Sequence, residues 1–220
     1  MNRPTLRSVR AFTLIELLTV VAIIGVLSAI LLVTLGKARS MAERTSTIAS
    51  LRSVGLAIAA YVNDDRQGRL PGNLNIGQMP GYSTNNRRYL GYFLWPYLSD
   101  PEPTATTYVS PALKNRAYER QRVSEGMGID TFVYMVCTQI GSSAKGNLLA
   151  NPFGNGSEEN KPPYPISFVK LAEYSPSKEW AIRDVDRKIR SGSNYLPEPP
   201  LGNVRMHLYF DWHVAPVKVE

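Results

Sequence analysis

The apolar residues of this chain are most concentrated near its start, where they form an unbroken run. The stretch from Leu17 to Gly36 holds 20 residues without a charge. A helix of this length spans roughly 30 Å, the thickness of the hydrocarbon core of a bilayer. The run therefore predicts a transmembrane helix near the N-terminus. One carboxylate, Glu16, lies at the apolar start of this helix, and an ionisable group in such a place indicates a function.

After Gly36 the pattern becomes amphipathic. The less polar positions recur at steps of four, three, three, three, four and three, at Met41, Thr45, Ile48, Leu51, Val54, Ile58 and Tyr61. This spacing places them on one face of a helix. Because there is no proline between Pro4 and Pro71, one continuous helix is predicted from about Phe12 to Asn63. Its second half should lay an apolar stripe on a globular domain.

The rest of the chain predicts a small sheet. Residues 68–130 are rich in glycine and proline, which favours an irregular connection with short helices at 89–95 and 112–125. Runs rich in β-branched and aromatic residues then predict four strands, at 130–140, 180–185, 203–210 and 214–219. A hairpin turn is expected at 211–213, and a strand or short turn at 166–171. The predicted fold class is α+β, with the long helix packed on an antiparallel sheet of about four strands.

The segment at residues 11–17, with the sequence AFTLIEL, resembles the processing site of type IV prepilins and type II secretion pseudopilins. A leader with three arginines precedes it, and the apolar run follows. The resemblance implies that a prepilin peptidase cuts between Ala11 and Phe12 and methylates the new N-terminus. It also implies that Glu16, the fifth residue of the mature chain, acts in assembly. Ala11 stands where the family usually has glycine.

The resemblance further implies an organisation for the whole chain. The expected parts are a cleaved leader at 1–11, a transmembrane and polymerisation half of the helix at 12–36, an amphipathic half at 37–65, and an extracytoplasmic pilin-like domain at 66–220. The implied partners are the prepilin peptidase, like or related pilin subunits, the inner-membrane assembly machinery and membrane lipid. The chain is expected to cross the inner membrane once, with its leader cytoplasmic, and then to enter a periplasmic or surface filament.

Composition narrows the classes of partner. The formal net charge is +7, of which the leader supplies three, and the chain has no basic run of the kind that marks a nucleic-acid site. With Cys137 as its one cysteine the chain forms no intramolecular disulfide, and this residue is expected to be a small buried hydrophobe in a strand. Two other interpretations of the apolar run are a secretory signal peptide and an uncleaved single-pass anchor.

Two groups of side chains are candidates for chemistry. His207, Asp211 and His213 could form a metal site or an acid–base group, or a hairpin in which the aspartate caps the turn. Asp184 and Asp186 lie near the end of a predicted strand and are candidate oxygen ligands for calcium, which some pseudopilins bind. No calcium-ligand loop with alternating aspartates is present, so we expect no bound metal or other cofactor.

The chain lacks the sequence motifs of serine hydrolases, P-loop nucleotide-binding proteins, zinc proteases and dinucleotide-binding proteins. We therefore expect a non-enzymatic subunit of a type IV pilus or a type II secretion pseudopilus. The alternative is a membrane-anchored extracytoplasmic enzyme or binding module that uses His207, Asp211 and His213. Glu16 separates the two hypotheses, because a simple anchor has no reason to keep a carboxylate beside lipid.

Overall fold

The computed structural model describes residues 12–141, 146, 148–154 and 164–219. The chain divides into two compact units, residues 1–42 and residues 43–220. Helix α1 extends from Leu14 to Asp64 and contributes to both units. The single long helix predicted from the sequence is therefore confirmed, with ends within two residues of those expected. The functional division of the chain at residues 36 and 65 stays a prediction.

The second unit contains a five-stranded antiparallel sheet with the order β1-β4-β7-β8-β9. Its strands are β1 (Gly77–Gln78), β4 (Tyr134–Val136), β7 (Trp180–Asp184), β8 (Val204–Tyr209) and β9 (Val214–Lys218). Each of the four predicted strand regions contributes a strand to this sheet, and the α+β class is confirmed. The fifth strand, β1, comes from the segment that was expected to be irregular. It fits at the sheet edge because Gly77 has no side chain, and a Cβ there would lie 2.7 Å from the Phe132 ring.

Two predictions for individual segments need correction. The strand expected over 130–140 is interrupted after β4, and the chain then pairs β5 (Gln139–Ile140) with β6 (Leu149–Ala150) in a separate ribbon. The segment 166–171 ends in the short helix α4 (Phe168–Leu171). Its first part is extended, because the amide of Leu70 donates to Ile166 O and the amide of Phe168 donates to Gly68 O. These partners are far away in the sequence, so local composition does not reveal them.

The remaining short elements surround the sheet and the second half of α1. They are the ribbon of β2 (Gly81–Tyr82) with β3 (Tyr108–Val109), the helices α2 (Leu90–Leu94) and α3 (Arg116–Ser124), and the 3-10 turns at Trp95–Tyr97 and Ala172–Tyr174. Asn115 caps the N-terminus of helix α3, because its side chain accepts the amides of Ala117 and Tyr118 at 3.0 and 3.3 Å. This is an ordinary N-cap, since the first amides of a helix have no partner within the helix.

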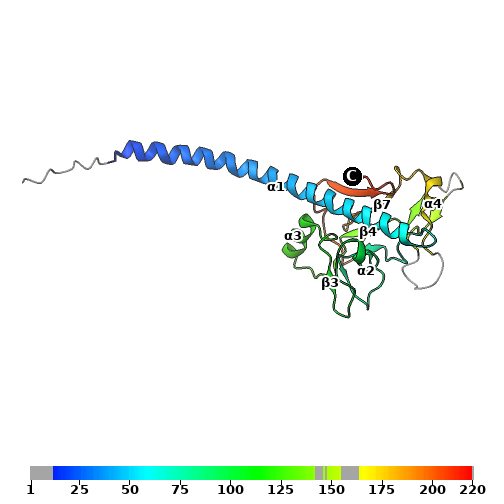
Figure 1. Ribbon diagram of the computed structural model, residues 1–220. Helices are drawn as coiled ribbons and strands as arrows, with labels where there is room; N and C mark the ends of the chain where they lie inside the picture. The colour runs from blue at the N-terminus through cyan, green and yellow to red at the C-terminus, as the bar shows by residue number, and fades with distance from the viewer. Residues whose placement is uncertain (1–11, 142–145, 147, 155–163, 220) are drawn as a thin grey trace, which may run out of the picture. The chain divides into compact units, whose positions relative to one another are not determined.

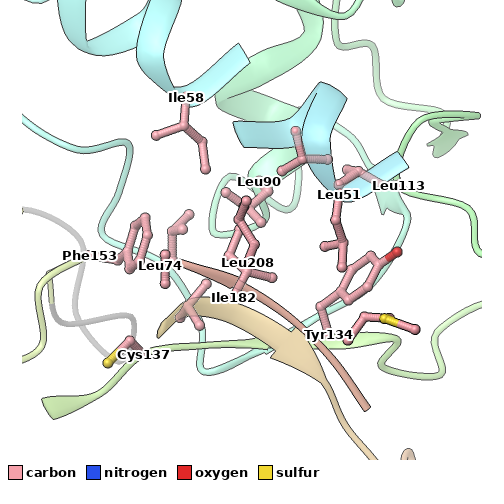
Figure 2. Close-up of a cluster of buried hydrophobic side chains, with 14 of the residues drawn as sticks. Leu51, Ile58, Leu74, Leu90, Leu113, Tyr134, Cys137, Phe153, Ile182 and Leu208 are labelled. Carbon is pink, nitrogen blue, oxygen red and sulfur yellow. The ribbon is translucent and has the colours of Figure 1, made fainter. Parts of the chain in front are cut away.

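The core forms where α1 crosses the sheet (Figure 1). Figure 2 shows Leu51 and Ile58 of α1 pointing toward Ile182 of β7 and Leu208 of β8, with Leu74 beside them. Leu51, Val54 and Ile58 are buried, as the amphipathic spacing predicted. Burying such side chains contributes about 1.5–3 kcal/mol each relative to leaving them exposed. The helix packs closely on the sheet at Gly55, where an added Cβ would lie 3.0 Å from Leu208 Cδ1 and 3.3 Å from Trp212 Cβ.

The predicted hairpin turn at 211–213 joins β8 to β9. Trp212 has a φ of +68°, in the left-handed region that favours glycine. Its ring stacks on Phe168 with centroids 5.5 Å apart, and the residue also packs beside Gly55. Stacking on Phe168 and packing beside Gly55 stabilise the half-buried Trp212 side chain and offset the backbone strain of this turn.

Replacing Leu51 by alanine should lower the free energy of unfolding by about 2–5 kcal/mol, because the side chain is 0% exposed and its loss leaves a cavity. Leu56 on the same helix is 67% exposed, so the matched change Leu56→Ala should alter stability by less than about 0.5 kcal/mol. Urea unfolding of a form that begins at Lys37, followed by circular dichroism, measures both. Similar losses from the two variants would contradict the observed packing of α1.

Candidate processing and assembly segment

The N-terminus of α1 is closed by a reciprocal pair of hydrogen bonds between Thr13 and Glu16. The backbone amide and the hydroxyl of Thr13 both donate to Glu16 Oε2, at 2.9 and 2.7 Å. In return, the amide of Glu16 donates to Thr13 Oγ1 at 3.3 Å. This arrangement is a capping box, in which two otherwise unpaired amides at the helix start are satisfied. The carboxylate of Glu16 is therefore held by its own helix in the uncut chain.

Thr13 was not predicted to be a site residue, although the sequence carries a signal for it. The spacing Thr-x-x-Glu immediately before an apolar run is the sequence signature of a capping box. The predicted cut site is only partly visible, because Phe12 lies within the described residues and Ala11 lies outside them.

The helix that follows has apolar side chains on every side. Each described side chain from Leu14 to Leu35 is exposed, including Leu14 at 83% and Leu27 at 55%. Within the described residues, α1 is the one helix long and apolar enough to cross a membrane. Because water solvates such a surface poorly, this segment requires lipid or other apolar helices around it.

Residues 6–32 match a protein-family model described as the prokaryotic N-terminal methylation motif. The chain carries a prepilin-type cleavage and methylation motif. Comparison with curated proteins and with solved structures finds no match. The matched residues include Ala11, Phe12, Thr13 and Glu16, so the motif and the capping box coincide. Together with the long helix and the antiparallel sheet, the motif supports a type IV pilin-like or pseudopilin-like precursor.

The candidate histidine cluster is spread along the β8–β9 hairpin. His213 Nδ1 lies 2.5 Å from Asp211 Oδ1, and the same oxygen accepts the backbone amide of His213 at 3.2 Å. The rings of His213 and Tyr209 stack with centroids 4.3 Å apart. The ring of His207 lies 6.2 Å from that of Tyr209 and 6.1 Å from that of Trp180, between centroids. The structure thus brings Asp211 and His213 together, with the aspartate capping the turn.

The second candidate pair, Asp184 and Asp186, is buried at the end of β7. Asp186 is 0% exposed and accepts two hydrogen bonds from Arg205, at 2.7 and 2.9 Å. Asp184 Oδ2 accepts the backbone amide of Met206 at 2.8 Å. Both carboxylates therefore bind neighbouring parts of the sheet. Among residues 12–141, 146, 148–154 and 164–219, no three His, Cys, Asp or Glu side chains form a group that could hold a metal ion.

Burial shifts the pKa of two groups beside the sheet centre in opposite senses. It raises the pKa of Asp184 from 3.8 to about 7. Burial, together with the nearby guanidinium groups of Arg183 and Arg205, lowers the pKa of His207 from 6.5 to about 4. Desolvation disfavours the charged form of each group, which is why the pKa of the carboxyl rises and the pKa of the imidazole falls.

These shifts predict two opposite pH profiles of stability. The folded chain holds the proton of Asp184 more tightly than the unfolded chain. The stability that the protonated Asp184 contributes is therefore complete below about pH 3.8 and is lost as the pH rises to about 7. The folded chain binds a proton at His207 more weakly than the unfolded chain does. The stability that the neutral His207 contributes is therefore present above about pH 6.5 and is lost as the pH falls to about 4.

Between pH 4 and 6.5, the stability of Asp184→Asn relative to the unchanged chain should therefore rise with pH, and that of His207→Phe should fall. Each change should amount to about 2 kcal/mol. Urea unfolding at several pH values, on forms beginning at Lys37, measures both. Parallel profiles for the two variants would contradict the assigned shifts.

Proposed function

We propose that this chain is a structural subunit of a type IV pilus or a type II secretion pseudopilus. A prepilin peptidase cuts it between Ala11 and Phe12, the helix holds it in the inner membrane, and the globular unit lies outside the cytoplasm. The observation that carries the proposal is the match of residues 6–32 to the methylation motif on a helix whose apolar side chains are exposed on all sides. Such a surface suits lipid before assembly and neighbouring helices after it.

Glu16 provides the mechanism by which processing controls assembly. In the uncut chain the carboxylate caps its own helix through Thr13. Cleavage before Phe12 creates an α-amino cation close to this carboxylate. When helices bundle and exclude water, an unpaired carboxylate costs far more than it does in water, so the cation of the same or a neighbouring subunit compensates it. Because only one axial offset between neighbouring helices places the charges together, the pair also fixes the register of the subunits.

The first test of this proposal is the site of processing. Removal of the 11-residue leader from the 220-residue chain leaves 209 residues that start at Phe12. Intact-mass and N-terminal peptide analysis of the membrane form should find this chain with a methylated α-amino group. A mature chain that retains Met1, or one cut after residue 30, would show that the motif does not direct processing.

The second test separates the charge of Glu16 from its capping role. Glu16→Gln keeps a side-chain oxygen that can accept from Thr13 but removes the charge, whereas Thr13→Val removes the cap and keeps the charge. Glu16→Gln and Glu16→Val should both insert and be cleaved, yet their filament yield should fall at least about tenfold, since a charge pair in a water-excluded bundle is worth more than 1.4 kcal/mol. Thr13→Val should assemble, with a cost of about 1 kcal/mol to the helix start.

Comparison of the processed, membrane-inserted and sheared-filament fractions measures these yields. Normal filaments from both Glu16 variants would remove the charge pair from the mechanism. A loss of filaments from Thr13→Val as large as that from Glu16→Gln would assign the role of Glu16 to capping instead.

A further inference from the structure

An exposed side of helix α3 combines two arginines with an apolar side chain. Arg116, Arg120 and Val123 are spaced four and three residues apart, which places them along one side of the helix. All three are exposed, and Val123 is 65% exposed. The buried residues of α3, Ala117 and Tyr118, pack into the globular unit instead. We call Arg116, Arg120 and Val123 the α3 face.

One ion pair fixes the α3 face beside the first residues that α1 contributes to the globular unit. Arg120 Nη2 donates to Glu43 Oε2 at 2.9 Å, and Glu43 is the first residue of that unit. Figure 1 shows α3 at this end of the globular unit and α4 at the other end. There the amide of Phe168 donates to Gly68 O at 2.7 Å, a few residues after α1 ends at Asp64.

The length of the chain keeps the Glu43 end of the globular unit close to any membrane that holds the apolar run. Glu43 follows Gly36, the end of the uncharged run, by seven residues. Seven residues span about 10 Å as a helix and at most about 25 Å when fully extended. The polar layer on each side of the hydrocarbon core is about 5–8 Å thick. Glu43 therefore stays near the lipid headgroups for any orientation of the globular unit.

Positive charge gathers around Glu43. Between residues 37 and 52, the sequence of α1 has four basic residues and one acidic residue. The acidic residue is Glu43, which is paired with Arg120. Arg44 is exposed, as is Arg116 of the α3 face. Guanidinium groups bind phosphate oxygens in pairs, and each basic residue near an anionic membrane strengthens the attraction to it.

The acidic residues of the α3 segment leave this charge in place. Within the helix, Glu119 pairs with Arg122 at 2.8 Å and with Lys114 at 3.6 Å. Glu125 and Asp130 are exposed, but they follow the last residue of the helix and lie outside the α3 face. A basic surface that also exposes an apolar side chain is typical of segments that lie in the interfacial layer of a bilayer.

We propose that the α3 face docks on an anionic bilayer surface, with Arg44, Arg116 and Arg120 among the headgroup phosphates and Val123 at the acyl boundary. The proposal rests on the membrane anchoring in the proposed function. A bilayer is favoured over a second copy of this chain, because the chain tethers this end to the membrane and because two copies of a basic face repel each other. Docking orients the globular unit before assembly, and entry into a filament requires its release.

Spin labels at two matched valines test where the α3 face lies. Val123→Cys and Val169→Cys each put the label on an exposed helical residue, 65% and 81% exposed, at opposite ends of the globular unit. The full chain is reconstituted in vesicles of phosphatidylcholine, with or without phosphatidylglycerol. Electron paramagnetic resonance then measures access of oxygen, which enters lipid, and of a water-soluble nickel chelate. Cys137 is 1% exposed, and the unchanged chain, treated in parallel, shows any label that it takes up.

When phosphatidylglycerol is added, the label at position 123 should gain access to oxygen and lose access to nickel, while the label at position 169 should stay aqueous. Replacing Arg44 and Arg116 together by glutamine should lower the ratio of docked to undocked chain at least about fivefold, since one cation near an anionic membrane is worth about that factor. Arg66 is exposed beyond the C-terminal end of α1, so Arg66→Gln should change the ratio less than about twofold. Circular dichroism checks that these variants are folded.

Equal access of nickel to positions 123 and 169 in phosphatidylglycerol vesicles would overturn the proposal, as would unchanged docking of the double arginine variant. Spin–spin broadening at position 123 that is the same in both kinds of vesicle and grows with the protein-to-lipid ratio would assign the α3 face to a second copy instead. Flotation of the vesicles after an alkaline wash measures insertion separately. A chain that floats without docking overturns docking alone, whereas a chain that does not float overturns the membrane anchoring as well.

Discussion

The burial of one face of α1 against the sheet is the contact on which the globular unit depends. The strands of this unit are short, and a small sheet with one apolar face is stable only when another element covers it. Leu51, Val54 and Ile58 supply that cover, and Gly55 allows the helix to come close to Leu208 and Trp212. Segments far apart in sequence, such as those carrying Leu74, Leu90 and Phe153, join the same core. These segments are held in place because their side chains are buried in the same core.

The same helix meets two different environments along its length. Up to Leu35 its apolar residues are exposed on all sides, whereas from Glu43 onward one face is buried. Glu43 itself is largely buried and pairs with Arg120 of α3 at 2.9 Å. A uniform apolar surface cannot be covered by one small domain, so the first stretch needs lipid or other subunits. The two environments of α1 thus follow from the change in its hydrophobic pattern. They fit the proposed function, in which the subunit is first held in a membrane and later polymerised.

Buried charged residues link β7 to β8 in the middle of the sheet. Asp186 and Arg205 connect the segment after β7 to β8 through two hydrogen bonds, and Asp184 binds the backbone of β8. Burying a carboxylate without a partner is costly, so each of these contacts restricts the register in which β7 and β8 can pair. The carboxylates that the sequence offered as calcium ligands have their observed partners within the sheet. Burial beside this part of the sheet, together with the guanidinium groups of Arg183 and Arg205, lowers the pKa of His207.

The sequence alone determined the features that depend on local spacing. The long helix, the stripe at Leu51, Val54 and Ile58, the four main strands and the prepilin-type motif around Phe12 and Glu16 could all be predicted, because periodicity and short motifs are properties of neighbouring residues. The capping partner Thr13 was also within reach, since its spacing from Glu16 is a local signal.

Tertiary structure decided what depends on residues distant in the chain. The pairing of β1 with β4, the stacking of Trp212 on Phe168, the partners of Asp184 and Asp186, and the ion pair of Arg120 with Glu43 join segments separated by tens of residues. Short polar or glycine-rich segments carry little pattern of their own. Their conformation is set by whichever buried surface and hydrogen-bond partners the folded core presents to them, and these exist only once the helix has covered the sheet.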